Sequence, residues 1–120
     1  MYELSIGGHF SSAHFLRGYP GSCKQLHGHT WKVEVTISSK ELNELGLVFD
    51  FREIKIKLKE FLATLDHTCL NELPAFAKAN PTTENLAKYV YQEFCQRCVP
   101  FKVKKVQVWE SDNASITYWE

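Results

Sequence analysis

The amino-acid sequence predicts a single α+β domain in which two helices cover one face of a four-stranded antiparallel sheet. Apolar and polar residues alternate near both ends of the chain, whereas the middle holds two segments whose apolar residues recur every three or four positions. The order strand, strand, helix, helix, strand, strand is typical of such a layered architecture. Because 120 residues suffice for one hydrophobic core but not for two, we expect one domain spanning residues 1–120.

The first strand is expected over about residues 2–14. Its apolar residues share one parity with His14, whereas His9 has the opposite parity. A bulge at Gly7-Gly8 would shift this parity, so alternation alone leaves His9 as an alternative to His14. Residues 17–22 are rich in turn formers and return the chain, which predicts an antiparallel hairpin with the next strand.

The second strand begins with His27-Gly28-His29. Alternate residues after the histidines continue an apolar face: Trp31, Val33, Val35 and Ile37. Because alternate side chains of a strand share a face, His27 and His29 project together, roughly 6.5–7 Å apart along the chain, and the hairpin brings His14 beside them. Zinc would satisfy these imidazoles on an apolar face, and backbone carbonyls are the alternative partners.

Two helices follow. Asp50-Phe51-Arg52-Glu53 is typical of a capping box for a helix running to about Leu65. The segment 80–85 opens the second helix, with Pro81 expected in its first turn and Pro100 ending it. Cys95 and Cys98 form a lone CxxC motif, for which core packing is favoured over metal binding.

The final two strands are expected at about 102–110 and 114–119, with Asp112-Asn113 in the turn. Glu110 shares a face with Val106 and Val108. Such a carboxylate lies either in water at the end of the sheet or against a cationic or hydrogen-bonding ligand.

Composition excludes some classes of function. The 14 basic and 14 acidic residues balance, so no nucleic-acid partner is indicated. The first residues have no signal-peptide pattern, and no segment approaches the roughly 20 apolar residues of a membrane span. We therefore expect a cytoplasmic protein without a membrane partner, in which the four cysteines are thiols, metal ligands or catalytic groups.

Several short motifs occur together in one order. They are Ser12-Ala13-His14, Cys23 ahead of His27-Gly28-His29, Asp66-His67 followed by Leu70-Asn71, Pro81-Thr82-Thr83-Glu84-Asn85, and Glu110. Together they resemble the tetrahydropterin synthase family, which includes 6-pyruvoyl- and 6-carboxy-tetrahydropterin synthases, over nearly the whole chain. The resemblance implies a tunnelling fold, whose barrel closes only on oligomerisation, as a homohexamer of two trimers or a homotetramer.

The resemblance also implies roles for individual residues. Zinc (Zn2+) would be held by His14, His27 and His29, with Cys23 as the proton-abstracting base and Asp66 with His67 as the other part of the acid-base machinery. Glu110 would anchor the pterin ring of 7,8-dihydroneopterin triphosphate, with Thr82 or Thr83 nearby. Lys24 should favour the Cys23 thiolate. Because Phe15 stands where many relatives have arginine, Arg17 or Lys24 would contact the triphosphate.

The spacing of Cys23 and His27 separates the two branches of the family. Three residues lie between them, which resembles the 6-carboxy-forming enzymes of queuosine biosynthesis, since the pyruvoyl-forming type usually has a longer spacer. The alternatives are a 6-pyruvoyl-tetrahydropterin synthase, which only eliminates triphosphate, and a non-catalytic zinc- or pterin-binding module. In that module Cys23 would complete a closed site with the three histidines.

Overall fold

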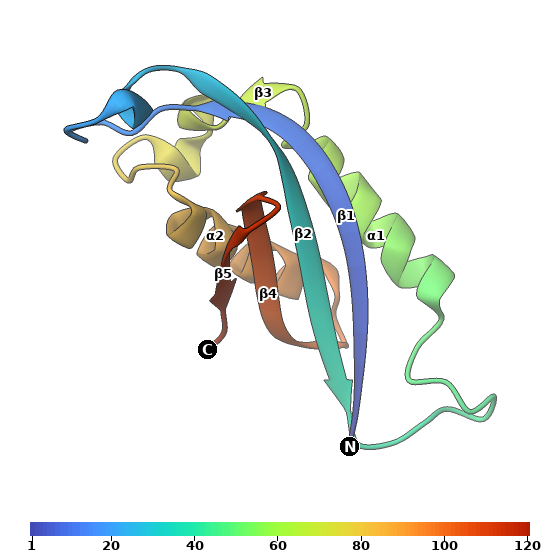
Figure 1. The fold of residues 1–120 in the computed structure, drawn as a ribbon. Coiled ribbons are helices and arrows are strands. Elements are labelled where there is room, and N and C mark those ends of the chain that lie inside the picture. The colour runs from blue at the N-terminus through green and yellow to red at the C-terminus, as the bar shows by residue number, and fades with distance from the viewer.

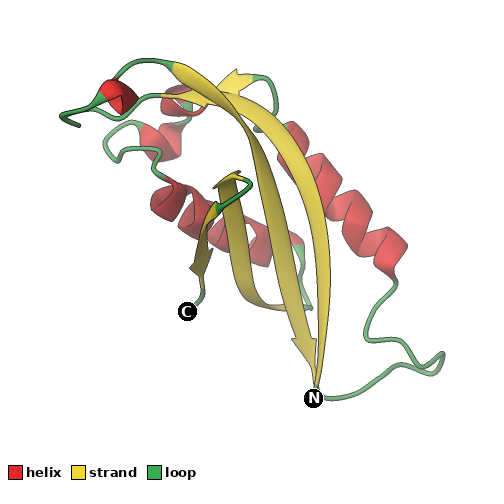
Figure 2. Ribbon diagram, in the orientation of Figure 1, coloured by secondary structure: helices red, strands yellow, loops and turns green.

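The computed structural model describes residues 1–120 as strands and helices arranged in two layers (Figures 1 and 2). In chain order the elements are β1 (Tyr2–His14), η1 (Ser22–Lys24), β2 (His27–Ser39), α1 (Phe51–Ala63), β3 (Thr68–Cys69), η2 (Leu70–Glu72), η3 (Pro74–Phe76), α2 (Thr83–Arg97), β4 (Lys102–Ser111) and β5 (Ala114–Tyr118). Both long helices lie on the same side of the sheet, as predicted. The α+β class is therefore confirmed.

The sheet contains five strands in the order β3-β1-β2-β4-β5, so the prediction of four strands was wrong. The additional strand is β3, which pairs parallel to β1 at Ser12 and Ala13. Two residues are too few to show a period of two, so β3 could not be predicted from alternation. The other four strands pair antiparallel, as expected.

The β1–β2 hairpin is regular over its whole length. Its register runs without interruption from Tyr2 opposite Ser39 to His14 opposite His27, so the possible bulge at Gly7-Gly8 does not occur. Gly8 instead makes room for α1, because a Cβ atom there would lie 2.7 Å from Cδ1 of Leu62. With the parity unbroken, His14 shares the helix-facing side of β1.

Both helices have polar N-caps. The side chain of Asp50 accepts a hydrogen bond from Arg52 N at 2.9 Å, and Thr82 accepts one from Asn85 N at 3.1 Å. The second helix therefore begins at Thr83, and the expectation that Pro81 lies in its first turn was wrong. Thr82 is the N-cap, because its side chain satisfies a free N–H group of the first turn, and Pro81 therefore lies one residue before the cap.

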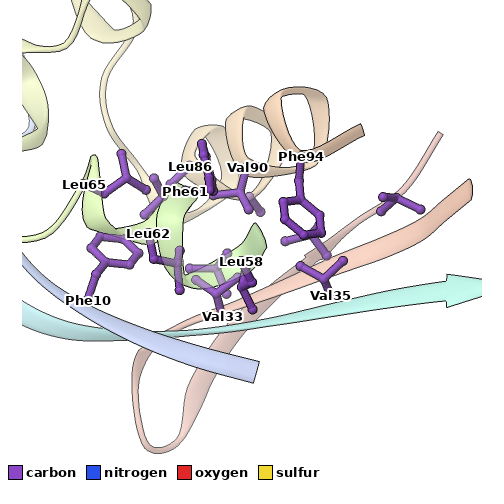
Figure 3. Packing of buried hydrophobic residues seen from close by; sticks show 14 of the residues in the cluster. Phe10, Val33, Val35, Leu58, Phe61, Leu62, Leu65, Leu86, Val90 and Phe94 are labelled. Atoms are coloured by element: carbon purple, nitrogen blue, oxygen red, sulfur yellow. The ribbon is translucent and has the colours of Figure 1, made fainter. Parts of the chain in front are cut away.

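The core fills the space between the helices and the sheet (Figure 3). Phe10, Val33 and Val35 from the sheet meet Leu58, Phe61, Leu62, Leu65, Leu86, Val90 and Phe94 from the helical layer. Cys98 belongs to this buried cluster and Cys95 packs against it, which agrees with the predicted structural role of the CxxC motif. No helix combines the length and apolar character that crossing a membrane requires.

Candidate metal centre and active site

Three histidines meet where the β1–β2 hairpin opens. His14 ends β1 and lies opposite His27, which begins β2, while His29 lies opposite Ser12. The ring centroids are 4.6 Å apart for His14 and His27, 4.8 Å for His27 and His29, and 5.2 Å for His14 and His29. His9 is exposed on the opposite parity. The structure thus brings together the three histidines that the sequence singled out.

Backbone carbonyls fix the orientation of two of these rings. Nδ1 of His14 lies 2.8 Å from Pro81 O, and Nδ1 of His27 lies 2.7 Å from Gln25 O. A carbonyl can only accept, so Nδ1 carries the proton in both rings and the Nε2 lone pairs remain available. This arrangement, with a carbonyl behind the imidazole, is typical of histidines that ligate metals.

Two nitrogens of the cluster are buried without a hydrogen-bond partner: Nε2 of His14 and Nε2 of His29. Burial lowers the pKa of His14, with a smaller contribution in the same direction from neighbouring histidines. Burial likewise lowers the pKa of His29. At neutral pH both rings are therefore neutral, the form in which imidazole binds a metal ion.

Glu110, at the end of β4, reaches the same cluster. Its Oε1 atom lies 2.9 Å from His29 Nε2 and 3.6 Å from His14 Nε2, close contacts that form no hydrogen bond, while Oε2 accepts a hydrogen bond from Thr83 Oγ1 at 2.9 Å. Of the two alternatives left by the sequence, the structure favours the carboxylate facing a polar cluster. Such a cluster can also take a cation or a hydrogen-bonding ligand.

The donor set fits a metal ion. One potential ligand atom from each of His14, His27, His29 and Glu110 lies within 4.8 Å of the others. Three imidazoles are a known ligand set of catalytic zinc sites, which keep one position open for water or substrate. The buried, unpartnered nitrogens supply a physical reason for a cation at this point, because leaving them unsatisfied is costly.

A cavity of about 420 Å³ adjoins the histidines. Residues on its wall include five of the predicted site residues: His14, Cys23, Thr82, Thr83 and Glu110. Arg17 also lines it, but one end of its guanidinium is engaged, since Nη2 donates to Phe76 O at 2.6 Å and to Ala79 O at 3.1 Å. Lys24 is exposed and does not line this cavity. The cavity thus combines a thiol, carboxylates and one imidazole of the candidate metal centre.

Asp66 and His67 lie elsewhere in the same chain. The carboxylate of Asp66 accepts a hydrogen bond from Ser11 N at 2.8 Å and lies 3.5 Å from Nδ1 of His67. His67 has a left-handed backbone (φ 56°), and its side chain is 81% exposed. It lines a separate recess with His29 and Thr68, which does not include Cys23. A single chain therefore does not bring the two predicted acid-base groups into one cavity.

Sequence reasoning missed several groups that shape the site. Gln25 and Pro81 contribute through backbone carbonyls, which every residue has, so no sequence signal could identify them. Asn80 and Glu84 also border the cavity. Glu84 belongs to the Pro81-Thr82-Thr83-Glu84-Asn85 motif and Asn80 directly precedes it, and this position was the one available signal.

The fold and the site together define a class of protein: an α+β domain with three histidines that could hold a metal ion, beside a cavity that carries a thiol and a carboxylate. The family model for 6-pyruvoyl tetrahydropterin synthase matches residues 3–120. The chain belongs to this family.

Named relatives agree with the assignment. The 6-carboxy-5,6,7,8-tetrahydropterin synthase of Bacillus subtilis is 37% identical over 95 residues, which cover 75% of this chain and 63% of that protein. The protein of the same name from Synechocystis is 30% identical over 115 residues, covering 92% and 87% of the two chains. The solved 6-pyruvoyl tetrahydropterin synthase of Caenorhabditis elegans has the same fold, with a TM-score of 0.90 at 23% identity over 99% of this chain and 95% of that one.

Proposed function

We propose that this chain is a zinc-dependent 6-carboxy-5,6,7,8-tetrahydropterin synthase. It would convert 7,8-dihydroneopterin triphosphate into 6-carboxy-tetrahydropterin, with release of acetaldehyde and triphosphate, as an early cytoplasmic step towards queuosine and other deazapurines. The observation that carries the proposal is the cluster of three histidines and Glu110, of which His14 and Glu110 line the same cavity as Cys23. The names of the relatives and the three-residue spacer between Cys23 and His27 support the carboxy-forming branch.

Zinc is the proposed metal, held by His14, His27 and His29. When bound, it supplies a Lewis acid that polarises a substrate oxygen and makes an adjacent carbon–hydrogen bond easier to deprotonate. The two backbone carbonyls behind His14 and His27 keep those rings in the ligating tautomer.

Glu110 is the proposed anchor of the pterin ring. Its carboxylate can accept two hydrogen bonds from the guanidine-like edge of the ring, which is the strong, bidentate kind of recognition. The hydroxyl of Thr83 donates to Oε2 and so orients the carboxylate. Thr82 uses one lone pair of its hydroxyl oxygen to cap α2, which leaves its O–H group and a second lone pair for the substrate. Of the two candidates for the triphosphate, Arg17 is favoured over Lys24 because it lines the cavity.

Cys23 is the proposed general base, which removes a proton from the side-chain carbon of the substrate. His67, oriented by Asp66, would return or remove a proton on the other side. Triphosphate would leave by elimination, and cleavage of the remaining side chain would release acetaldehyde.

A complete site requires more than one subunit in this account. Cys23 and His67 line different cavities of one chain, which supports a site shared between copies. Most of the outer edge of β1 and the outer edge of β5 are unpaired, and assembly would cover such edges. We propose that the single domain of residues 1–120 assembles as a homohexamer of two trimers or a homotetramer.

The test is incubation of the purified, zinc-loaded protein with 7,8-dihydroneopterin triphosphate, with identification of the products by mass. We expect 6-carboxy-tetrahydropterin and one equivalent of acetaldehyde. A 6-pyruvoyl product without acetaldehyde would assign the chain to the other branch. No turnover, with the zinc still bound, would favour the non-catalytic module. Cys69→Ala serves as a control thiol variant, since Cys69 lies in β3, away from the cavity wall.

A further inference from the structure

The segment that carries Cys23 connects β1 to β2 and has little regular structure of its own. We call residues 15–26 the Cys23 loop. Its first residue, Phe15, is held by a side chain: Phe15 N donates to Oδ1 of Asn71 at 2.9 Å, and Nδ2 of Asn71 donates to Phe15 O at 2.9 Å. One amide thus satisfies both backbone groups of Phe15.

Asn80 repeats this arrangement two residues further on. Arg17 N donates to Oδ1 of Asn80 at 2.8 Å, and Nδ2 of Asn80 donates to Arg17 O at 2.9 Å. An asparagine amide carries an acceptor and a donor, so it can take the place of a peptide group on a neighbouring strand. The two asparagines therefore extend the pairing of β1 beyond its last residue.

The residue between them connects this extension to Cys23. That residue is Leu16. Its N–H group donates to the carbonyl oxygen of Cys23 at 2.8 Å. The backbone carbonyl of Cys23 is thus held by residues 15–17, which are held in turn by Asn71 and Asn80.

Asn80 also lies next to the metal centre. The carbonyl of the following residue, Pro81, is the partner of His14 Nδ1 at 2.8 Å. The carbonyl of Asn80 itself accepts a hydrogen bond from Nδ2 of Asn85 at 2.8 Å, which ties it to the first turn of α2. One dipeptide, Asn80-Pro81, therefore orients a metal-binding histidine through a carbonyl and the Cys23 loop through a side chain.

We propose that Asn80 is a positioning residue that sets the place of Cys23 relative to the histidine centre. The proposal rests on the proposed function only in taking Cys23 as the base. Asn80 need not touch the substrate, because its effect passes through Arg17 and Leu16 to Cys23.

The test compares Asn80→Ala with the wild type in the zinc-loaded protein. A base displaced by about 1 Å can cost on the order of 100-fold, so we expect kcat to fall about 10–100-fold with zinc content unchanged. Amide exchange at Leu16 should accelerate, because the segment that carries this N–H group is no longer held at Arg17. Asn80→Asp keeps an acceptor for Arg17 N and should recover part of the lost kcat. Added to Cys23→Ala, Asn80→Ala should cost no further turnover.

Asn43→Ala is the matched control. Its amide oxygen accepts from Leu45 N and Leu47 N in an exposed loop far along the chain from the site, so kcat and Leu16 exchange should stay at wild-type values. An unchanged kcat in Asn80→Ala, loss of zinc, or full additivity with Cys23→Ala would overturn the proposal. If the wild type turns over no substrate, the proposed function fails, and exchange at Leu16 alone decides the role of Asn80: unchanged exchange overturns it.

Discussion

Oε1 of Glu110 lies 2.9 Å from Nε2 of His29, across the ends of β4 and β2. The contact places a carboxylate beside the proposed zinc ligands, while Oε2 of the same carboxylate is bonded to Thr83. A pterin ring anchored on Glu110 would therefore have its side chain next to the histidines. This proximity matters because the pterin ring must bind next to the groups that would carry out the chemistry.

The ligand set predicts how zinc content responds to substitution. His14→Ala should lose most of its zinc, because only two imidazoles would remain in the cluster. His9→Ala is the matched control, since His9 lies on the same strand but on the opposite, exposed side. Elemental analysis of both variants decides the point. Full zinc in His14→Ala would show that the ion lies elsewhere.

Glu110→Ala should weaken pterin binding without releasing zinc. A charge-assisted hydrogen bond is worth about 1.5–3 kcal/mol, so affinity should fall by roughly one to two orders of magnitude. Titration with a pterin and a metal assay measure the two effects separately. Loss of zinc with little change in pterin affinity would instead identify Glu110 as a metal ligand.

Two adjacent threonines should behave differently. Thr82→Ala removes the cap of α2 and should lower the free energy of unfolding by about 0.5–2 kcal/mol, measured in urea. Thr83→Val removes the hydrogen bond that orients Glu110 and should mainly reduce pterin affinity. If Thr83→Val binds pterin as tightly as the wild type does, the orienting role of its hydroxyl is wrong.

A shared site predicts complementation between inactive variants. Cys23→Ala and His67→Ala subunits, unfolded and reassembled together, should recover up to about a quarter of wild-type turnover, because random pairing leaves that share of sites with both groups intact. Each variant reassembled alone is the control. Hybrids that remain inactive, although assembled and zinc-loaded, would mean that one chain supplies both groups.

Much of this site could be predicted from the sequence because strand periodicity reports which face a side chain occupies. The prediction that His14, His27 and His29 lie together requires a β1–β2 hairpin without a bulge, and the register of this hairpin is uninterrupted. Partners that act through a backbone carbonyl, such as that of Pro81, cannot be recognised from the sequence, because every residue has such a carbonyl. The side-chain hydrogen bonds from Phe15 to Asn71 and from Arg17 to Asn80 join residues that are 56 and 63 positions apart, and local sequence patterns carry no information over such separations.

Long-range contacts also account for the strand β3, which was not predicted, and for the start of α2, which was predicted too early. The pairing of β3 is set by tertiary contacts, since Ser12 bonds the carbonyl of Leu65 and His67 N bonds Ser11 O. For α2, either Asn80 or Thr82 has a side chain that can cap a helix. Only the structure reveals that the amide of Asn80 is engaged with Arg17, which leaves Thr82 as the cap.

The central claim, that Cys23 is a catalytic base beside a zinc centre, is tested most directly by measuring zinc content, thermal stability and turnover of Cys23→Ala together. A general base contributes typically 10²–10⁴-fold, so turnover should fall by about that factor while zinc and stability are kept. In the wild type, iodoacetamide should modify half-buried Cys23 before Cys98, whose pKa burial raises to about 11. A Cys23→Ala protein that loses zinc and stability together would contradict the account, because Cys23 would then be a structural ligand.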